Sequence, residues 1–304
     1  MISHWRGAHW GAIAITAGAL AVAGCSSGHS GSSAHNDPAQ QASGSPSAST
    51  GGGSVSAAQA IQQAAQHAQK VTSYAADVTV KTTGTASSTI SGTLQQRTEP
   101  SPAAVANFSH VTVQGQAVQG GMQEIINSSG VYLKMAQLAR QTGKPWIEIP
   151  ASSLSKVSGA SFGQLLQNGS NDPLVQTQML SSSTNVKKVG TATLNGVPVT
   201  EYTGTYPITA GLSKLPSATR GKIASQLQAM GLTTEHFTVW LDGQQQVRKV
   251  VNSAQGTKEQ VASTIVVTSV NQPVRVTVPP AAQTAKVPAS ELGGSSSGSA
   301  GTAS

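Results

Sequence analysis

The stretch that decides the fold runs from Tyr74 to Lys81 and reads YAADVTVK. Its larger apolar side chains stand at every second position, on the face that Tyr74, Val78 and Val80 share. Asp77, Thr79 and Lys81 fall on the other face. This two-residue alternation is typical of an antiparallel strand with one buried and one solvated face. Ile90 and Leu94 alternate with polar residues in the same way and predict a second strand.

Further strands and one helix are expected around this stretch. Alanines and Ile61 recur at helical spacing between Ser56 and Val71, which predicts an N-terminal helix. The strands expected next are Ser109 to Val113, Met122 to Asn127, Val131 to Met135 and Trp146 to Ile149. Two short helical segments follow, from Phe162 to Gln167 and from Leu174 to Leu180.

The second half of the chain contains two hairpin signals. Asn195-Gly196 stands between strands expected at 186–194 and 197–205, and both turn residues tolerate positive φ. Asp242-Gly243 stands between 234–241 and 247–253 in the same way. A helix is expected over 215–230, ended by Gly231, and further alternation over 263–271 and 274–278. The order of elements predicts an α+β fold with one large antiparallel sheet.

The first 24 residues have the pattern of an export signal. A short apolar run over 11–22 follows Arg6 and is too short to span a bilayer. It ends in Val22-Ala23-Gly24-Cys25, which matches the lipobox of bacterial lipoproteins. Cys25 is the only cysteine in the chain and is therefore the predicted site of lipid attachment. We expect a protein anchored to the cell membrane on its extracytoplasmic side.

The predicted domain limits follow from composition. Residues 1–24 form the signal, and residues 25–55 form the lipidated cysteine with a disordered tether rich in Ser, Gly and Ala. A tether of about 30 residues reaches roughly 30 Å on average. Residues 56–288 form one domain, and residues 289–304 form a disordered tail.

The charge pattern argues against a nucleic-acid partner. The balance of 18 Lys and Arg against 11 Asp and Glu gives a net charge of +7, but the basic residues are scattered and only 4% of residues are aromatic. A nucleic-acid surface needs clustered basic side chains. The sequence predicts no cofactor and no metal site, because His67, His110 and His236 lie far apart without i, i+4 partners.

A catalytic interpretation has little support. Gly159-Ala160-Ser161-Phe162-Gly163 matches the nucleophile elbow of serine hydrolases, and Asp172 and His236 would follow in the expected order. However, the nearest strand ends at Ile149, and the elbow requires a strand running directly into the turn. We therefore expect a non-enzyme. Glutamates in or beside strands are expected on the solvent face; these are Glu124, Glu148, Glu201 and Glu235.

A large sheet with few, thin helices leaves two possibilities for its apolar face. The aliphatic side chains could enclose a cavity suited to an acyl chain, or they could pack into a solid core. The scarcity of large aromatic side chains favours the cavity, but residue content alone favours the solid core, because buried aliphatic side chains ordinarily pack against one another.

Several short motifs resemble the LppX/LprAFGN family of actinobacterial lipoproteins. They are VYLK at 131–134, PWIEI at 145–149, DPL at 172–174, GTATLNGV at 190–197, TEYTG at 200–204 and FTVWLD at 237–242. The resemblance implies a curved antiparallel half-barrel with helices on its concave side, and a cavity that holds acylated lipids or glycolipids for transfer across the envelope. The candidates for its wall are Val78, Val80, Ile90, Leu94, Val111 and Val113.

The resemblance leaves an alternative function open. The same fold with a filled core would make a non-enzymatic envelope sensor or scaffold that binds a protein partner, and an envelope transporter is one such partner.

Overall fold

The computed structural model describes residues 55–153 and 173–287, apart from positions 86, 216, 218–219, 222–223, 225–226 and 229. Thirteen strands within these ranges form one sheet. The strands of the first half are β1 (Ser73–Gly84), β2 (Ser88–Arg97), β3 (Ala103–Val113), β4 (Gln116–Ala117), β5 (Met122–Asn127), β6 (Gly130–Lys134) and β7 (Trp146–Pro150). Those of the second half are β8 (Lys187–Leu194), β9 (Val197–Pro207), β10 (Thr234–Asp242), β11 (Val247–Gln255), β12 (Glu259–Val270) and β13 (Thr284–Lys286).

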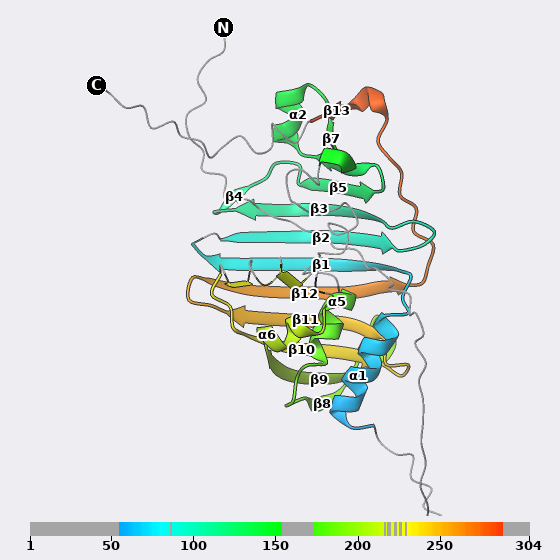
Figure 1. Cartoon of the computed structure of the whole chain (residues 1–304), viewed down its shortest axis with the longest axis vertical. Helices are drawn as coiled ribbons and strands as arrows, with labels where there is room; N and C mark the ends of the chain where they lie inside the picture. Colours follow the sequence, from blue (N-terminus) through cyan, green and yellow to red (C-terminus); the bar gives the residue numbers. More distant parts are fainter. Residues whose placement is uncertain are drawn as a thin grey trace, which may run out of the picture.

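The sheet is open and almost wholly antiparallel. Its strand order is β13-β7-β6-β5-β3-β2-β1-β12-β11-β10-β9-β8, and β4 pairs with β3 beside this path. Only β13 runs parallel to its neighbour, β7. The two edge strands, β13 and β8, lie at opposite ends of the sheet and do not pair with each other (Figure 1). This confirms the predicted class, a large antiparallel sheet with few helices.

The helices are short and pack mainly on one half of the sheet. α1 (Ala57–Ala68) begins at Ser56, whose hydroxyl accepts from the Gln59 N–H while the Gln59 side chain accepts from the Ser56 N–H. This reciprocal capping satisfies two backbone donors that would otherwise have no partner. α5 (Pro173–Leu180) agrees with the predicted segment, whereas α2 (Ala136–Thr142) and α6 (Ile208–Ser213) were not predicted. The described positions between 217 and 228 are helical, as expected.

The first predicted hairpin is confirmed in detail and the second only in outline. Asn195 and Gly196 join β8 to β9 with φ angles of 50° and 80°, the positive values that this turn requires. In the hairpin from β10 to β11, the positive φ falls at Gln245 and not at Gly243. The side chain of Asp242 holds this loop by accepting from the Gln244 and Gln246 N–H groups, bonds that the sequence pattern does not show.

The strand expected over 274–278 is wrong. β12 already pairs with β1 on one side and β11 on the other, so the segment that follows finds no free strand beside it. The Val274 carbonyl instead accepts from the Arg97 guanidinium at 3.1 Å. The chain then crosses to the far edge, where β13 pairs with β7 after the short 3-10 helix η1 (Ala281–Gln283).

One face of the sheet is apolar from β6 to β9, and two clusters of buried side chains occupy it. We call the first the helix-covered cluster. It joins α1, α5 and α6 to β9–β12 through residues such as Ile61, Leu180, Leu212, Phe237 and Val250. In Figure 1 these three helices lie over the strands β8–β12.

The second cluster, which we call the β1–β6 face, has a different environment. It contains residues of β1, β2, β3, β5 and β6, together with Ala68 and Val71 at the end of α1 and Ile265 of β12. Among the described residues, Ala68 is the one helical residue that this cluster contains. Within the described ranges, no helix combines the length and apolar character needed to cross a bilayer.

Candidate functional site

The structure brings the six predicted wall residues together on the β1–β6 face. Val80 of β1 pairs with Ile90 of β2, and Ile90 pairs with Val111 of β3, so these three form a row across the strands. Val78 and Leu94 are each 4% exposed and belong to the same cluster, and Val113 packs against it. Their common position agrees with the prediction, whereas their contact with a lipid remains a prediction.

The face becomes partly exposed toward one end of these strands. Five apolar residues there are only half-buried and pack against the β1–β6 face, and we call them the apolar rim: Val80, Val113, Val118, Leu133 and Met135. Val80 and Val113 stand near the β1–β2 turn and at the end of β3. None of these five side chains carries a charge.

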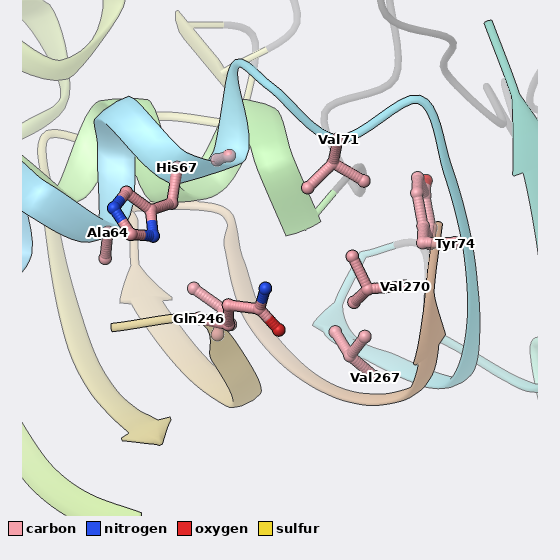
Figure 2. A pocket seen from close by; sticks show the side chains of 9 residues that line it. Ala64, His67, Val71, Tyr74, Gln246, Val267 and Val270 are labelled. Atoms are coloured by element: carbon pink, nitrogen blue, oxygen red, sulfur yellow. The ribbon is translucent and has the colours of Figure 1, made fainter. Parts of the chain in front are cut away.

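A small pocket lies where the two clusters meet, between α1 and the sheet (Figure 2). Figure 2 shows Val71, Tyr74, Val267 and Val270 on one side of it and Ala64, His67 and Gln246 on the other. Its volume is about 20 Å³, enough for one water molecule. Pockets that hold small-molecule ligands are usually about 300–1,000 Å³. Binding of an acyl chain at this seam therefore requires α1 to move away from the sheet.

Glu124 is the most unusual polar group on the β1–β6 face. It is 6% exposed, and its Oε2 atom has no hydrogen-bond partner within the described part of the chain. Burial raises the pKa of Glu124 to about 8, because the charged form is poorly solvated there. At neutral pH the carboxyl is therefore mostly protonated and can both donate and accept a hydrogen bond.

A second carboxyl occupies the helix-covered half of the same face. Glu235 of β10 stands opposite Tyr206 of β9, which belongs to the helix-covered cluster. Burial raises the pKa of Glu235 to about 7, against a smaller lowering by the Tyr206 hydroxyl. The buried Tyr206 hydroxyl interacts with the Glu235 carboxyl. Within the described structure, however, no atom meets the geometric criteria for a hydrogen bond to it.

The expectation that Glu124 and Glu235 lie on the solvent face is wrong. The alternation contained the signal, because Glu124 shares its face with Met122 and Ile126, and Glu235 shares its face with Phe237. Six strand steps separate β5 from β10 in the sheet, roughly 29 Å at the usual strand spacing. These two carboxyls therefore cannot act as the paired acid and base of a hydrolase.

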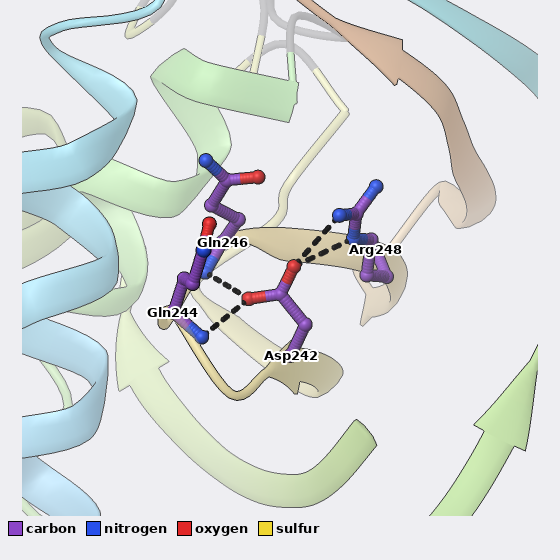
Figure 3. Close-up of polar contacts among 4 residues, drawn as sticks. All are labelled: Asp242, Gln244, Gln246 and Arg248. Atoms are coloured by element: carbon purple, nitrogen blue, oxygen red, sulfur yellow. Dashed lines mark hydrogen bonds and ion pairs between the residues drawn. The ribbon is translucent and has the colours of Figure 1, made fainter. Parts of the chain in front are cut away.

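The β10–β11 hairpin beside the pocket is held by one buried aspartate (Figure 3). Asp242 Oδ1 accepts from the Gln244 and Gln246 N–H groups at 2.9 and 3.0 Å. Asp242 Oδ2 accepts from Arg248 Nε at 2.8 Å and forms an ion pair with the same guanidinium. Since Gln246 also lines the pocket, this network fixes one wall of it.

The remaining sequence candidates add no chemistry to the described structure. Cys25, Ser161 and Asp172 lie outside the described residues, as does the helix expected from Phe162 to Gln167. His236 is exposed on β10, and His110 is exposed on β3, where its Nδ1 lies 3.1 Å from Ser109 Oγ. The described residues contain no group of three or more potential metal ligands.

Comparisons with known proteins give limited sequence similarity. No family model matches the chain. An uncharacterized 31.2 kDa protein from Streptomyces griseus is 34% identical over 113 residues, which are 35% of this chain and 36% of that protein. The chain thus matches little more than a third of the length of that curated relative.

Among solved structures, two mycobacterial lipoproteins are similar over most of their length. LprF from Mycobacterium bovis has a TM-score of 0.48 and 16% identity, covering 75% of this chain and 99% of LprF. LppX from Mycobacterium tuberculosis has a TM-score of 0.41 and 19% identity, covering 73% of this chain and 98% of LppX. The chain is similar to LprF and LppX, members of the lipoprotein family that its sequence motifs resemble.

Proposed function

We propose that this protein is a lipid-anchored envelope protein that binds acylated lipids or glycolipids on the β1–β6 face and helps to transfer them across the cell envelope. The observation that carries the proposal is an apolar sheet face, bordered by the apolar rim, in whose cluster Ala68 is the one helical residue among those described. In this proposal the face is the concave side of the half-barrel expected from the family resemblance.

The energetics suit a carrier. Removing one methylene from water contributes about 0.8 kcal/mol, so transfer of a long acyl chain from a membrane to water is strongly unfavourable. Moving it from the bilayer onto an aliphatic protein face exchanges one apolar surrounding for another. The net free-energy change is then small, and the lipid can be taken up and released.

The anchor complements this role. Acyl chains on Cys25 would hold the protein at the membrane, where its ligand is found, because two or more chains bind a bilayer durably. The segment between Cys25 and Ser56 would let the domain reach away from the surface. Neither step needs an enzymatic group.

Lipid extraction tests the proposal. The mature chain carrying Cys25→Ala should be purified, extracted with organic solvent and analysed by mass spectrometry, and then titrated with a fluorescent fatty acid. We expect co-purified acyl lipid and saturable uptake near one molecule per chain. Purified protein that contains no lipid and shows no uptake contradicts the proposal.

One observation favours a second function. The pocket at the seam is small, as expected for a filled core that serves a sensor or scaffold with a protein partner. Saturable binding near one lipid molecule per chain would exclude this alternative. Lipid-free protein with an intact fold would support it.

A further inference from the structure

Glu124 stands in a row of side chains that crosses the β1–β6 face from the apolar rim inward. It pairs with Leu133 of β6 on one side and with Ala106 of β3 on the other. The row continues from Ala106 to Leu94 and then to Ala76. Leu133 belongs to the apolar rim, so Glu124 is the first residue of the row behind the rim.

The residues of β3 beside Glu124 have small side chains. Ala106 and Ala104 occupy adjacent positions on this face of β3, and their methyl groups extend less than Leu or Ile side chains. Such small side chains alone could simply accommodate close packing. Here, however, a carboxyl that is 6% exposed points onto the same face, and its Oε2 atom has no partner in the described chain.

A purely structural role explains this carboxyl poorly. A buried polar atom without a partner costs stability, and an aliphatic side chain of similar size would remove that cost. The cost disappears equally when a ligand supplies the missing partner. Since burial raises the pKa of Glu124 to about 8, the group reaches a ligand at neutral pH mainly as an acid that can donate its proton in a hydrogen bond.

We propose that Glu124 is the polar anchor of the β1–β6 face, donating a hydrogen bond to the ester or amide carbonyl of an acylated lipid. This inference rests on the proposed function. The acyl chain then lies over Ala106, Leu94 and Ala76, while the polar head remains at the apolar rim beside Leu133. The ligand class becomes neutral lipids with an ester- or amide-linked acyl chain.

Two probes that differ in one carbonyl test the anchor. The mature Cys25→Ala chain should be titrated with 1-monopalmitoylglycerol and with 1-O-hexadecylglycerol, its ether analogue. The ester should bind roughly threefold to tenfold more tightly, the range expected for one net hydrogen bond. Glu124→Gln, which keeps an N–H donor, should retain this preference, and Glu124→Leu should bind the two probes equally.

Changing the pH adds an independent readout. Ionisation of Glu124 above about pH 8 should abolish the ester preference of the parent chain and leave that of Glu124→Gln unchanged. The cross-strand neighbours Ala106 and Leu133 carry no charge. The nearby His110 and Lys134 are exposed and stand next in sequence to Val111 and Leu133, which belong to the apolar face or its rim. Circular dichroism of each variant checks the fold.

The outcomes separate the anchor from the proposed function. If the parent chain binds both probes equally, or if Glu124→Leu retains the ester preference, the anchor is wrong while lipid binding stands. If neither probe binds the parent chain, the proposed function fails and the anchor fails with it.

Discussion

Val80 of β1 and Ile90 of β2 stand directly opposite each other on the apolar face, and Val80 remains half-buried while Ile90 is 9% exposed. The pair therefore marks the place where the β1–β6 face meets the apolar rim. A bulky residue at this position would block entry to the face without replacing a fully buried side chain.

Val80→Trp should lower the uptake of a fluorescent fatty acid at least tenfold, because the indole would occupy the space next to Ile90. The matched control is Thr79→Trp, which places the same side chain on the exposed face of β1. Uptake titrations with both variants measure the effect. Equal uptake by the two would contradict a binding site at this end of the face.

Cys25→Ala should release the protein from membranes. Without the thiol no acyl chains can be attached, and the loss of two or more chains removes most of the membrane affinity. Partition of the parent chain and of Cys25→Ala between detergent and aqueous phases measures this release. The intact mass of the membrane-bound parent chain shows whether acyl chains are attached. An unaltered partition would contradict anchoring through Cys25.

The carboxyls of Glu124 and Glu235, whose pKa values are raised, should make the protein less stable as the pH rises. For Glu235 the folded-state pKa is raised to about 7 from an ordinary value of 4.5. The unfolded chain therefore loses its proton first, and the free energy of unfolding is highest below about pH 4.5 and falls until about pH 7. The slope is at most about 1.4 kcal/mol per pH unit for each carboxyl.

Glu235→Gln should flatten this decline between pH 4.5 and 7, and Glu124→Gln should flatten it up to about pH 8. Urea unfolding at a series of pH values measures both. Glu201→Gln, on the opposite face of β9 from Tyr202, serves as the control. A parent chain whose stability rises across this range would contradict the burial of both groups.

Asp242→Ala should destabilise the β10–β11 hairpin by about 2 kcal/mol or more, because two backbone N–H groups and Arg248 lose their shared acceptor. Arg248→Ala should cost less, since Asp242 keeps the two backbone bonds and Arg248 is 25% exposed. Thermal unfolding of the two variants shows which substitution causes the larger loss of stability. A larger loss from Arg248→Ala would show that the ion pair matters more than the turn.

Gly92→Ala should cost more than about 2 kcal/mol. A methyl group at Gly92 would lie 2.6 Å from Phe108 Cα and against the Asn107 carbonyl, and neither backbone can move without breaking the β2–β3 ladder. Gly190→Ala is the matched control, because Gly190 also lies at a register shift but meets nothing within 4 Å. We expect it to change stability by about 0.5 kcal/mol or less. Equal losses would contradict the close approach at Gly92.

The local pattern of residues determined most of the strands. Tyr74, Val78 and Val80 identified β1 and its buried face, Asn195-Gly196 identified a hairpin, and Ser56 with Gln59 gave α1 a cap that needs no other part of the chain. These features depend on interactions between residues close in sequence. The same alternation placed the six wall candidates on one face, although it could not show that β1, β2 and β3 would be neighbours.

Only the tertiary structure decided the features that depend on strand order. Residues 274–278 alternate like a strand but form none, because β12 has no free edge, and β13 forms instead beside β7 at the far end of the sheet. The sequence puts Glu124 on the face of Met122 and Ile126, but its burial also depends on Ala106 and Leu133 on adjacent strands. Alternation assigns a side chain to a face, whereas the packing of distant segments determines whether water reaches that face.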